Sequence, residues 1–273
     1  MSLRIQNNVE AFNAHRQLTG TSNMLSKSME RLSSGYRINR AADDAAGLAI
    51  SEKMRAQIGG LDQAQRNAQD AVSLVQTAEG ALNEVHAMLQ RVRDLAVQFN
   101  NGTLASADQA AITAEVAQLC SEISRIGNDT KFNGIALLSG GGNITFQVGA
   151  EDGQTISLTG VSLFGSGATY QVDASIFSWA AGGAVTLASI DAAIANVSAA
   201  RGTFGATQNR LDHTLNNLAT YQENLTASES RIRDVDMAEE MTNFTKLQIL
   251  QQAGTAMLAQ ANQTSQSVLS LLK

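Results

Sequence analysis

The chain has 273 residues, a formal net charge of -6 and 44% hydrophobic residues, while only 4% of its residues are aromatic. It contains no proline, although average usage of about 5% would place roughly a dozen in a chain of this length. The negative charge and the absence of Lys and Arg clusters argue against nucleic acid as a partner. Because an internal proline breaks a helix, the composition favours long, uninterrupted helices.

The first residues of the chain bear on export. The stretch MSLRIQNNVEAFNAHRQ carries Asn, Glu, His and Arg where a cleaved signal peptide requires a continuous apolar core. No run of about 18 apolar residues follows, so no membrane span is predicted. We therefore expect no membrane partner, and a route other than a cleaved signal peptide if the protein leaves the cell.

The N-terminal segment carries a weak helical stripe. Its members recur every three or four residues: Ala11, His15, Leu18, Ser22, Leu25, Met29 and Leu32. This spacing is typical of a helix that packs on other helices. The stripe is too small to offset the ordering of more than thirty residues, so the segment needs a partner to fold.

The next segment has the strongest helical pattern in the sequence. Apolar residues from Leu61 to Phe99 alternate in spacings of three and four. Asp43 and Asp44 precede an Ala-rich run and predict the helix start, with Gly59-Gly60 as a weak point inside it. The run Asn100-Asn101-Gly102 predicts its end.

Two later segments repeat the same spacing and predict a bundle. One covers 112–126 and is expected to end at Gly127 and Asn128, and the other covers 190–225. The sequence between them is rich in Gly, Ser and Thr. Within it, about 143–158 alternates polar and apolar residues around the turn residues Glu151-Asp152-Gly153, which predicts a β-hairpin.

The C-terminal segment combines a helical period with a lack of charge. Residues 247–272 contain no Asp, Glu, Lys or Arg. They are too polar for lipid, and a helix face in water normally carries charge. We therefore predict that both terminal segments are poorly ordered in the free subunit and become helical between copies. The candidate intersubunit packing residues are Leu18, Leu25, Leu32, Leu247, Leu250, Met257, Val268 and Leu271.

No pattern in the sequence predicts catalysis, a cofactor or a metal. Asp43 and Asp44 are adjacent, so they point about 100° apart on a helix and fit a helix cap better than a catalytic pair. His15, His86 and His213 lack metal-ligand spacing. The lone Cys120 excludes an intramolecular disulfide and is interpreted as a small helix residue. We predict a structural protein and not an enzyme.

Several segments resemble bacterial flagellins. The first is Leu32 to Arg55, LSSGYRINRAADDAAGLAISEKMR, which is similar to the N-terminal signature of that family. Related patterns occur at 89–97, 130–134 and 229–238, in the family's order. The resemblance covers about the first 160 and the last 85 residues.

The resemblance implies a mainly α fold, an elongated antiparallel helical bundle in which the N- and C-terminal segments pair. Residues 1–42 and 235–273 would form an inner coiled coil. Residues 43–234 would form an outer helical layer with the hairpin and a short variable loop at about 159–186. The outer domains of longer flagellins would be absent.

The resemblance also implies a function. The chain would be the subunit of the flagellar filament, and the alternative is a low-copy hook-filament junction protein. Its implied partners are copies of itself, the flagellar cap, the hook-junction proteins and an export chaperone, with type III export to an extracellular filament. A host receptor, Toll-like receptor 5, would recognise a patch that falls on Arg91, Leu95 and Glu115.

Overall fold

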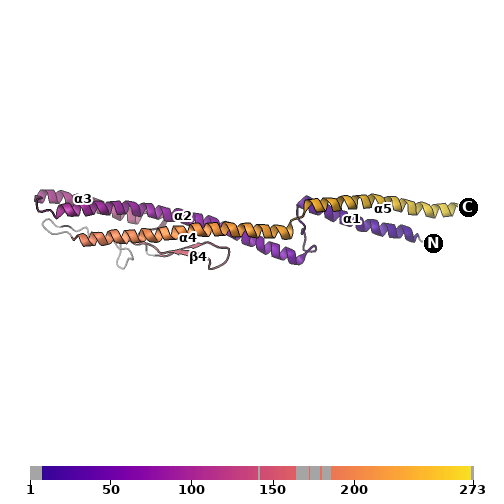
Figure 1. The fold of residues 1–273 in the computed structure, drawn as a ribbon, viewed down its shortest axis with the longest axis horizontal. Helices are drawn as coiled ribbons and strands as arrows, with labels where there is room; N and C mark the ends of the chain where they lie inside the picture. The colour runs from indigo at the N-terminus through magenta and orange to yellow at the C-terminus, as the bar shows by residue number, and fades with distance from the viewer. Residues whose placement is uncertain (1–7, 141, 164–171, 173–178, 180–185, 272–273) are drawn as a thin grey trace. The chain divides into compact units, whose positions relative to one another are not determined.

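The computed structural model describes residues 8–140, 142–163, 172, 179 and 186–271, with side chains up to residue 263. The described chain is mainly helical, with two short antiparallel strand pairs (Figure 1). Its elements in chain order are α1 (Val9–Ser34), α2 (Ala45–Phe99), α3 (Ser106–Asp129), β1 (Lys131–Phe132), β2 (Ile135–Ala136), β3 (Ile144–Gln147), β4 (Thr155–Leu158), α4 (Leu187–Arg233) and α5 (Met237–Leu271).

The chain forms two compact units. The first contains residues 1–56 and 224–273, and the second contains residues 57–223. The helices α2 and α4 each contribute residues to both units. The unit boundaries therefore fall inside helices and not at the predicted layer boundaries near 42 and 235. The division into an inner and an outer layer stays a prediction.

The second unit has a complete apolar core. All the apolar positions of the 3–4 stripe from Leu61 to Phe99 are buried, which confirms that this stripe is a packing seam. Buried residues of α3 and α4, among them Val116 and Phe204, belong to the same core. Spacings of three and four keep one face of a helix toward its neighbours, and the small Ala side chains of α2 let those neighbours come close.

The start of α2 is capped as predicted. The Asp44 carboxylate accepts a hydrogen bond from the Gly47 amide at 2.9 Å, at the N-cap position of the helix. The helix then runs through Gly59 without a break. At Gly60 an added Cβ would lie 2.9 Å from the Ala150 Cβ, so glycine here permits close packing and does not weaken the helix.

The predicted end of α3 was wrong. The helix continues through Gly127 and Asn128 to Asp129, and Gly127 is buried. The helix is followed by Thr130, whose backbone is extended. The Thr130 amide still donates a hydrogen bond to the Ile126 carbonyl at 3.1 Å. Gly127 is therefore a buried residue inside the last turn of the helix and not its cap.

The β-hairpin is confirmed. β3 and β4 pair antiparallel with Ile144 opposite Leu158, and Gly153 adopts a φ of 83° in the connecting turn. The Asn67 side chain of α2 donates to the Gln147 carbonyl at 3.1 Å, which ties the hairpin to the helix. Four described residues of the predicted variable loop also join the core, namely Val161, Leu163, Val172 and Trp179.

Candidate functional site

The terminal helices α1 and α5 form an antiparallel pair (Figure 1). The Asn8 side chain donates to the Ala261 carbonyl at 2.9 Å, and Ser28 bonds Glu240 near the other end of the pair. The less exposed positions recur every three or four residues on both helices. On α1 this series is Ala11, Ala14, Leu18, Thr21, Leu25, Ser28 and Leu32, and Gly20, Ser22, Glu30 and Arg31 are half-buried beside it. On α5 they are Glu240, Phe244, Leu247, Gln251, Gly254, Leu258 and Ala261.

We call these two sets of residues the terminal seam. It contains small and polar residues at positions where a stable helix pair usually has large apolar ones. Among the described side chains of α1 and α5, only Ser28, Glu240 and Gly254 are fully buried. The pair therefore buries little apolar surface within one chain.

The predicted packing residues fall into three groups. Leu18, Leu25, Leu32 and Leu247 are half-buried and belong to the terminal seam. Leu250 and Met257 lie outside it and are exposed, Met257 to 62%. The side chains of Val268 and Leu271 lie outside the described residues.

Part of the predicted terminal stripe was displaced by one residue. Ala14 and Ser28 are less exposed than the predicted His15 and Met29, whereas Thr21 and the predicted Ser22 are both half-buried. An antiparallel coiled-coil seam continues from Leu18 and Leu25 by a step of three to Thr21 and Ser28, whose polar side chains carry no apolar signal. The regular seven-residue spacing of Leu18, Leu25 and Leu32 is the one sequence signal from which they could be found.

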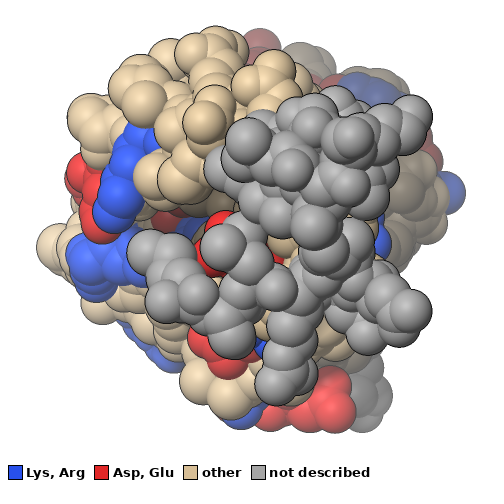
Figure 2. All heavy atoms as spheres, turned by 90° about the vertical axis from the view of Figure 1, so that its right-hand side faces the viewer, with Lys and Arg blue, Asp and Glu red and all other residues tan. Residues whose placement is uncertain are grey.

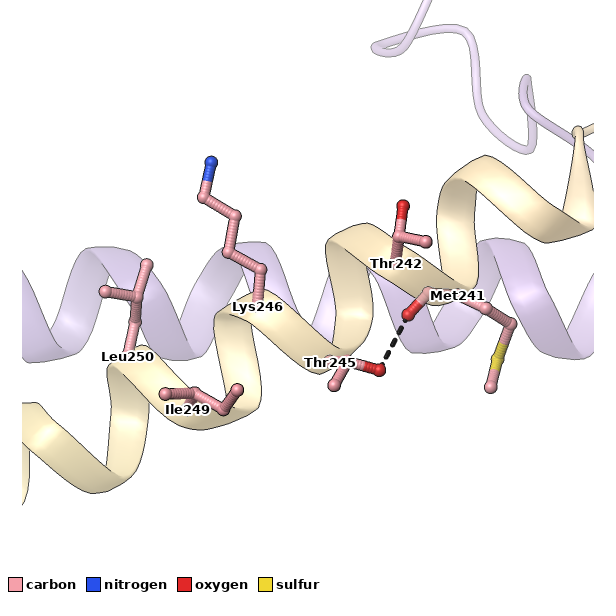
Figure 3. A pocket seen from close by; sticks show the side chains of 6 residues that line it. All are labelled: Met241, Thr242, Thr245, Lys246, Ile249 and Leu250. Atoms are coloured by element: carbon pink, nitrogen blue, oxygen red, sulfur yellow. Dashed lines mark hydrogen bonds between the residues drawn. The ribbon is translucent and has the colours of Figure 1, made fainter.

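The exposed faces of α5 carry large apolar side chains of the helix itself. Met241, Ile249 and Leu250 line a shallow groove with Thr245 and Lys246. Figure 3 shows the side chains of this groove leaving the α5 ribbon in different directions. A helix that is apolar on several sides is normally buried on several sides.

The exposed apolar set continues on α1. The exposed large residues of α1 are Val9, Phe12, Met24 and Met29. Figure 2 looks at this end of the molecule and shows, at its upper left, an area without Lys, Arg, Asp or Glu that is bordered by charged side chains. We call the exposed apolar residues of α1 and α5 the outer apolar face.

A polar cluster interrupts the terminal seam. The Ser28 hydroxyl donates to Glu240 Oε1 at 2.5 Å, and an Arg31 nitrogen lies 3.5 Å from Glu240 Oε2. Ser28 and Glu240 are only 3% and 8% exposed. Nearby, the ammonium of Lys27 and the backbone amides of Arg40 and Asn39 lower the pKa of Asp43 to about 2.

The segments that precede α2 and α5 are tied together beside this pair. The Arg37 amide donates to the Arg233 carbonyl at 2.7 Å, and the Val235 amide donates to the Gly35 carbonyl at 3.0 Å. The Arg233 guanidinium lies over the Tyr36 ring and pairs with Glu52 at 2.6 Å. Gly35 has a φ of 76°, a conformation that favours glycine and ends α1.

The three residues of the predicted receptor patch occupy different environments. Arg91 and Glu115 are exposed and form a salt bridge at 2.7 Å between α2 and α3. Leu95 is 2% exposed and belongs to the core of the second unit. Of the three, only the two charged side chains reach the surface of the chain.

The remaining candidates for chemistry are separate from one another. Cys120 is half-buried, and burial raises the pKa of its thiol to about 12, so the reactive thiolate is scarce at neutral pH. Among the described residues, no three His, Cys, Asp or Glu side chains gather as metal ligands would. The described helices also include none with the length and hydropathy of a membrane span.

Fold and surface together define a structural protein built to pack against further helices. Matches to known proteins identify the family. The model for the bacterial flagellin N-terminal helical region matches residues 5–142, and the model for the C-terminal helical region matches residues 187–272. The chain belongs to the bacterial flagellin family, which is a family of structural proteins.

Individual flagellins are similar to this chain over nearly its whole length. A flagellin of Halalkalibacterium halodurans is 53% identical over 270 residues, which cover 98% of this chain and 99% of that one. A flagellin of Bacillus subtilis is 49% identical over 304 residues, covering 99% and 100%. A crystal structure of Bacillus cereus flagellin is 35% identical, covers 56% of this chain and 88% of that one, and has a TM-score of 0.49.

Proposed function

We propose that this flagellar filament subunit polymerises by burying the outer apolar face of α1 and α5 between copies of itself. The observation that carries the proposal is the surface of α5. Met241, Ile249, Leu250 and Met257 are exposed on different sides of a helix that has no charged residue after Lys246 until the last residue of the chain. A helix with such a surface is more favourable when it is buried inside an assembly than when it is in contact with water.

The energetics of the terminal pair support the same proposal. Ordering one residue costs roughly 1–2 kcal/mol of backbone conformational entropy, and burial of apolar surface normally offsets this cost. The terminal seam supplies little of that burial, because its buried positions are Ser28, Glu240 and Gly254. Neighbouring copies would supply the rest, so ordering of the terminal helices would accompany assembly.

The contrast between the two units supports the proposed layers. The second unit has its own complete core, so the surrounding layer formed by 43–234 would be folded before assembly. The terminal segments 1–42 and 235–273 would form the inner coiled coil. In this arrangement the filament is rigid because both layers are made of long helices packed side by side.

The remaining proposals concern the setting in which this assembly takes place. The subunit would be exported by the flagellar type III apparatus to an extracellular filament. An export chaperone would bind its C-terminal segment, and growth would proceed under a cap after attachment to the hook-junction proteins. Arg91 and Glu115 would be the surface residues of a Toll-like receptor 5 patch, with Leu95 supporting them from the core. The proposal assigns no catalysis to the chain.

Seeded polymerisation of the purified chain tests the proposal. Negative-stain electron microscopy should show long filaments from the complete chain and none from a chain without residues 247–273, while circular dichroism shows that the second unit stays folded. Filaments from the truncated chain would contradict the proposal. Short stubs from the complete chain, with junction proteins present, would indicate the hook-junction alternative, which no observation on this chain favours.

A further inference from the structure

The terminal seam repeats every seven residues, so its apolar contacts do not select one alignment of α1 against α5. Leu18 lies against Gly254 in the structure. A slide of one heptad is a shift of about 10 Å along the helix and would place Leu18 against Leu247 or Ala261 instead. Both alternatives retain apolar contact, so some other interaction must distinguish the observed alignment.

The cluster of Ser28, Arg31 and Glu240 has this property. In the observed alignment the buried Glu240 carboxylate accepts a hydrogen bond from Ser28 and lies near the Arg31 cation. A slide of one heptad toward the N-terminus of α1 would replace Ser28 by Thr21 and Arg31 by Met24. Glu240 would then be buried without a cation, which is strongly unfavourable.

The same slide in the other direction is equally unfavourable. Glu240 would move past Leu32 to Gly35, where α1 has already ended. Two further contacts are consistent with the observed alignment. The Asn8 side chain caps α1 by accepting a hydrogen bond from the Ala11 amide, and it also donates a hydrogen bond to the Ala261 carbonyl of α5. Leu18 packs against Gly254, which has no side chain.

We infer that Ser28, Arg31 and Glu240 fix the register of α1 against α5. Register determines which side chains of the pair point outward, so the cluster selects the outer apolar face. This last step rests on the proposed polymerisation through that face. The register itself is set by residues of one chain, and it applies wherever α1 and α5 are paired.

Disulfide trapping measures the register directly. In a Cys120→Ser background, Leu18→Cys with Gly254→Cys reports the observed alignment, because the Leu18 Cβ lies 3.9 Å from the Cβ position at Gly254, within the range of a disulfide. Leu18→Cys with Ala261→Cys and Leu18→Cys with Leu247→Cys report the two slipped alignments. Non-reducing peptide mapping separates links within a chain from links between copies.

The full-length chain is compared with and without the cluster, both free and in seeded filaments. With the cluster intact, the reporter of the observed alignment should form at least tenfold more disulfide than either slipped reporter. With Ser28→Ala and Glu240→Leu together, this ratio should fall toward one. Glu30→Gln is the matched control, since it removes one carboxylate from the exposed Arg40–Glu30 pair on the same helix and should leave the ratio unchanged.

Three results would overturn the inference. The first is an unchanged ratio in the double variant, and the second is absence of the observed-alignment disulfide when the cluster is intact. If the double variant loses its helical circular dichroism, the single variant Ser28→Ala is measured instead. The third result is then a disulfide ratio in Ser28→Ala that equals the ratio in the parent chain. Loss of filaments with an unchanged ratio would instead count against polymerisation through the outer apolar face.

Discussion

Met257 provides a quantitative test of assembly through the outer apolar face. Its side chain is 62% exposed in the single chain and lies ten residues inside the uncharged C-terminal segment. Full burial of a Met side chain contributes about 1.5–3 kcal/mol, so burying the exposed part between copies contributes about 1–2 kcal/mol per subunit. Every 1.4 kcal/mol is about tenfold in an equilibrium constant.

A series of substitutions at Met257 separates the apolar contribution from the effect of charge. Met257→Leu keeps the size and polarity and should polymerise like the parent. Met257→Gln loses the apolar contribution and should raise the critical concentration roughly 5- to 30-fold. Met257→Asp adds an unpaired buried charge, which costs several kcal/mol more, and should prevent polymerisation at any practical concentration.

Sedimentation of seeded filaments at increasing subunit concentration measures the critical concentration for each variant. Circular dichroism of the free subunits is the control, because Met257 is exposed and its replacement should leave the second unit folded. Polymerisation of the Asp variant at the parent's critical concentration would refute the reasoning. It would mean that Met257 remains in contact with water in the filament.

Three further predictions concern single groups. The lowered pKa of Asp43 lies near 2 and its ordinary value near 3.8, so the stability from its pairing with Lys27 should be present above about pH 4 and lost as the pH falls toward 2. Asp43→Asn should remove this part of the pH dependence of thermal unfolding. Alkylation of the Cys120 thiol at pH 8 should be far slower than that of a free thiol and should recover in denaturant, whereas equal rates in both conditions would contradict its burial. Gly60→Ala should destabilise the second unit by about 1–3 kcal/mol through a clash with Ala150, measured by chemical denaturation, and Gly59→Ala should not.

The core of the second unit could be predicted from the sequence because one physical rule determined it. From Leu61 to Phe99 one unbroken series of apolar residues spaced by three and four is buried throughout, so the period identifies the face that packs, although single apolar residues such as Val97 lie outside it. The β-hairpin was predictable for a similar reason, since alternation of period two flanks a glycine turn at Gly153. The end of α3 was not, because Gly127 has the residue type of a helix cap but lies buried inside the last turn of the helix.

The terminal pair was only half predictable. Leu18 and Leu25 lie both on the predicted stripe and on the terminal seam, because the seam and the apolar pattern coincide there, and their role between copies stays a prediction. Ser28 and Glu240 were missed because they are polar, and Met257 was assigned to the stripe because it is apolar and correctly spaced. Where apolar residues lie on several sides of a helix, the period no longer identifies the face that contacts the partner within the chain.

The terminal pair distributes its residues in the opposite way to a globular helix pair. Its inner seam contains the polar contact between Ser28 and Glu240 and the small residue Gly254, while Leu250 and Met257 point outward. Polar contacts in a seam contribute direction and register but little stability, and outward apolar side chains contribute stability only when another surface covers them. On the two proposals, alignment within one chain and cohesion between chains are carried by different residues, so a substitution at Glu240 should change the alignment and one at Met257 should change only the assembly.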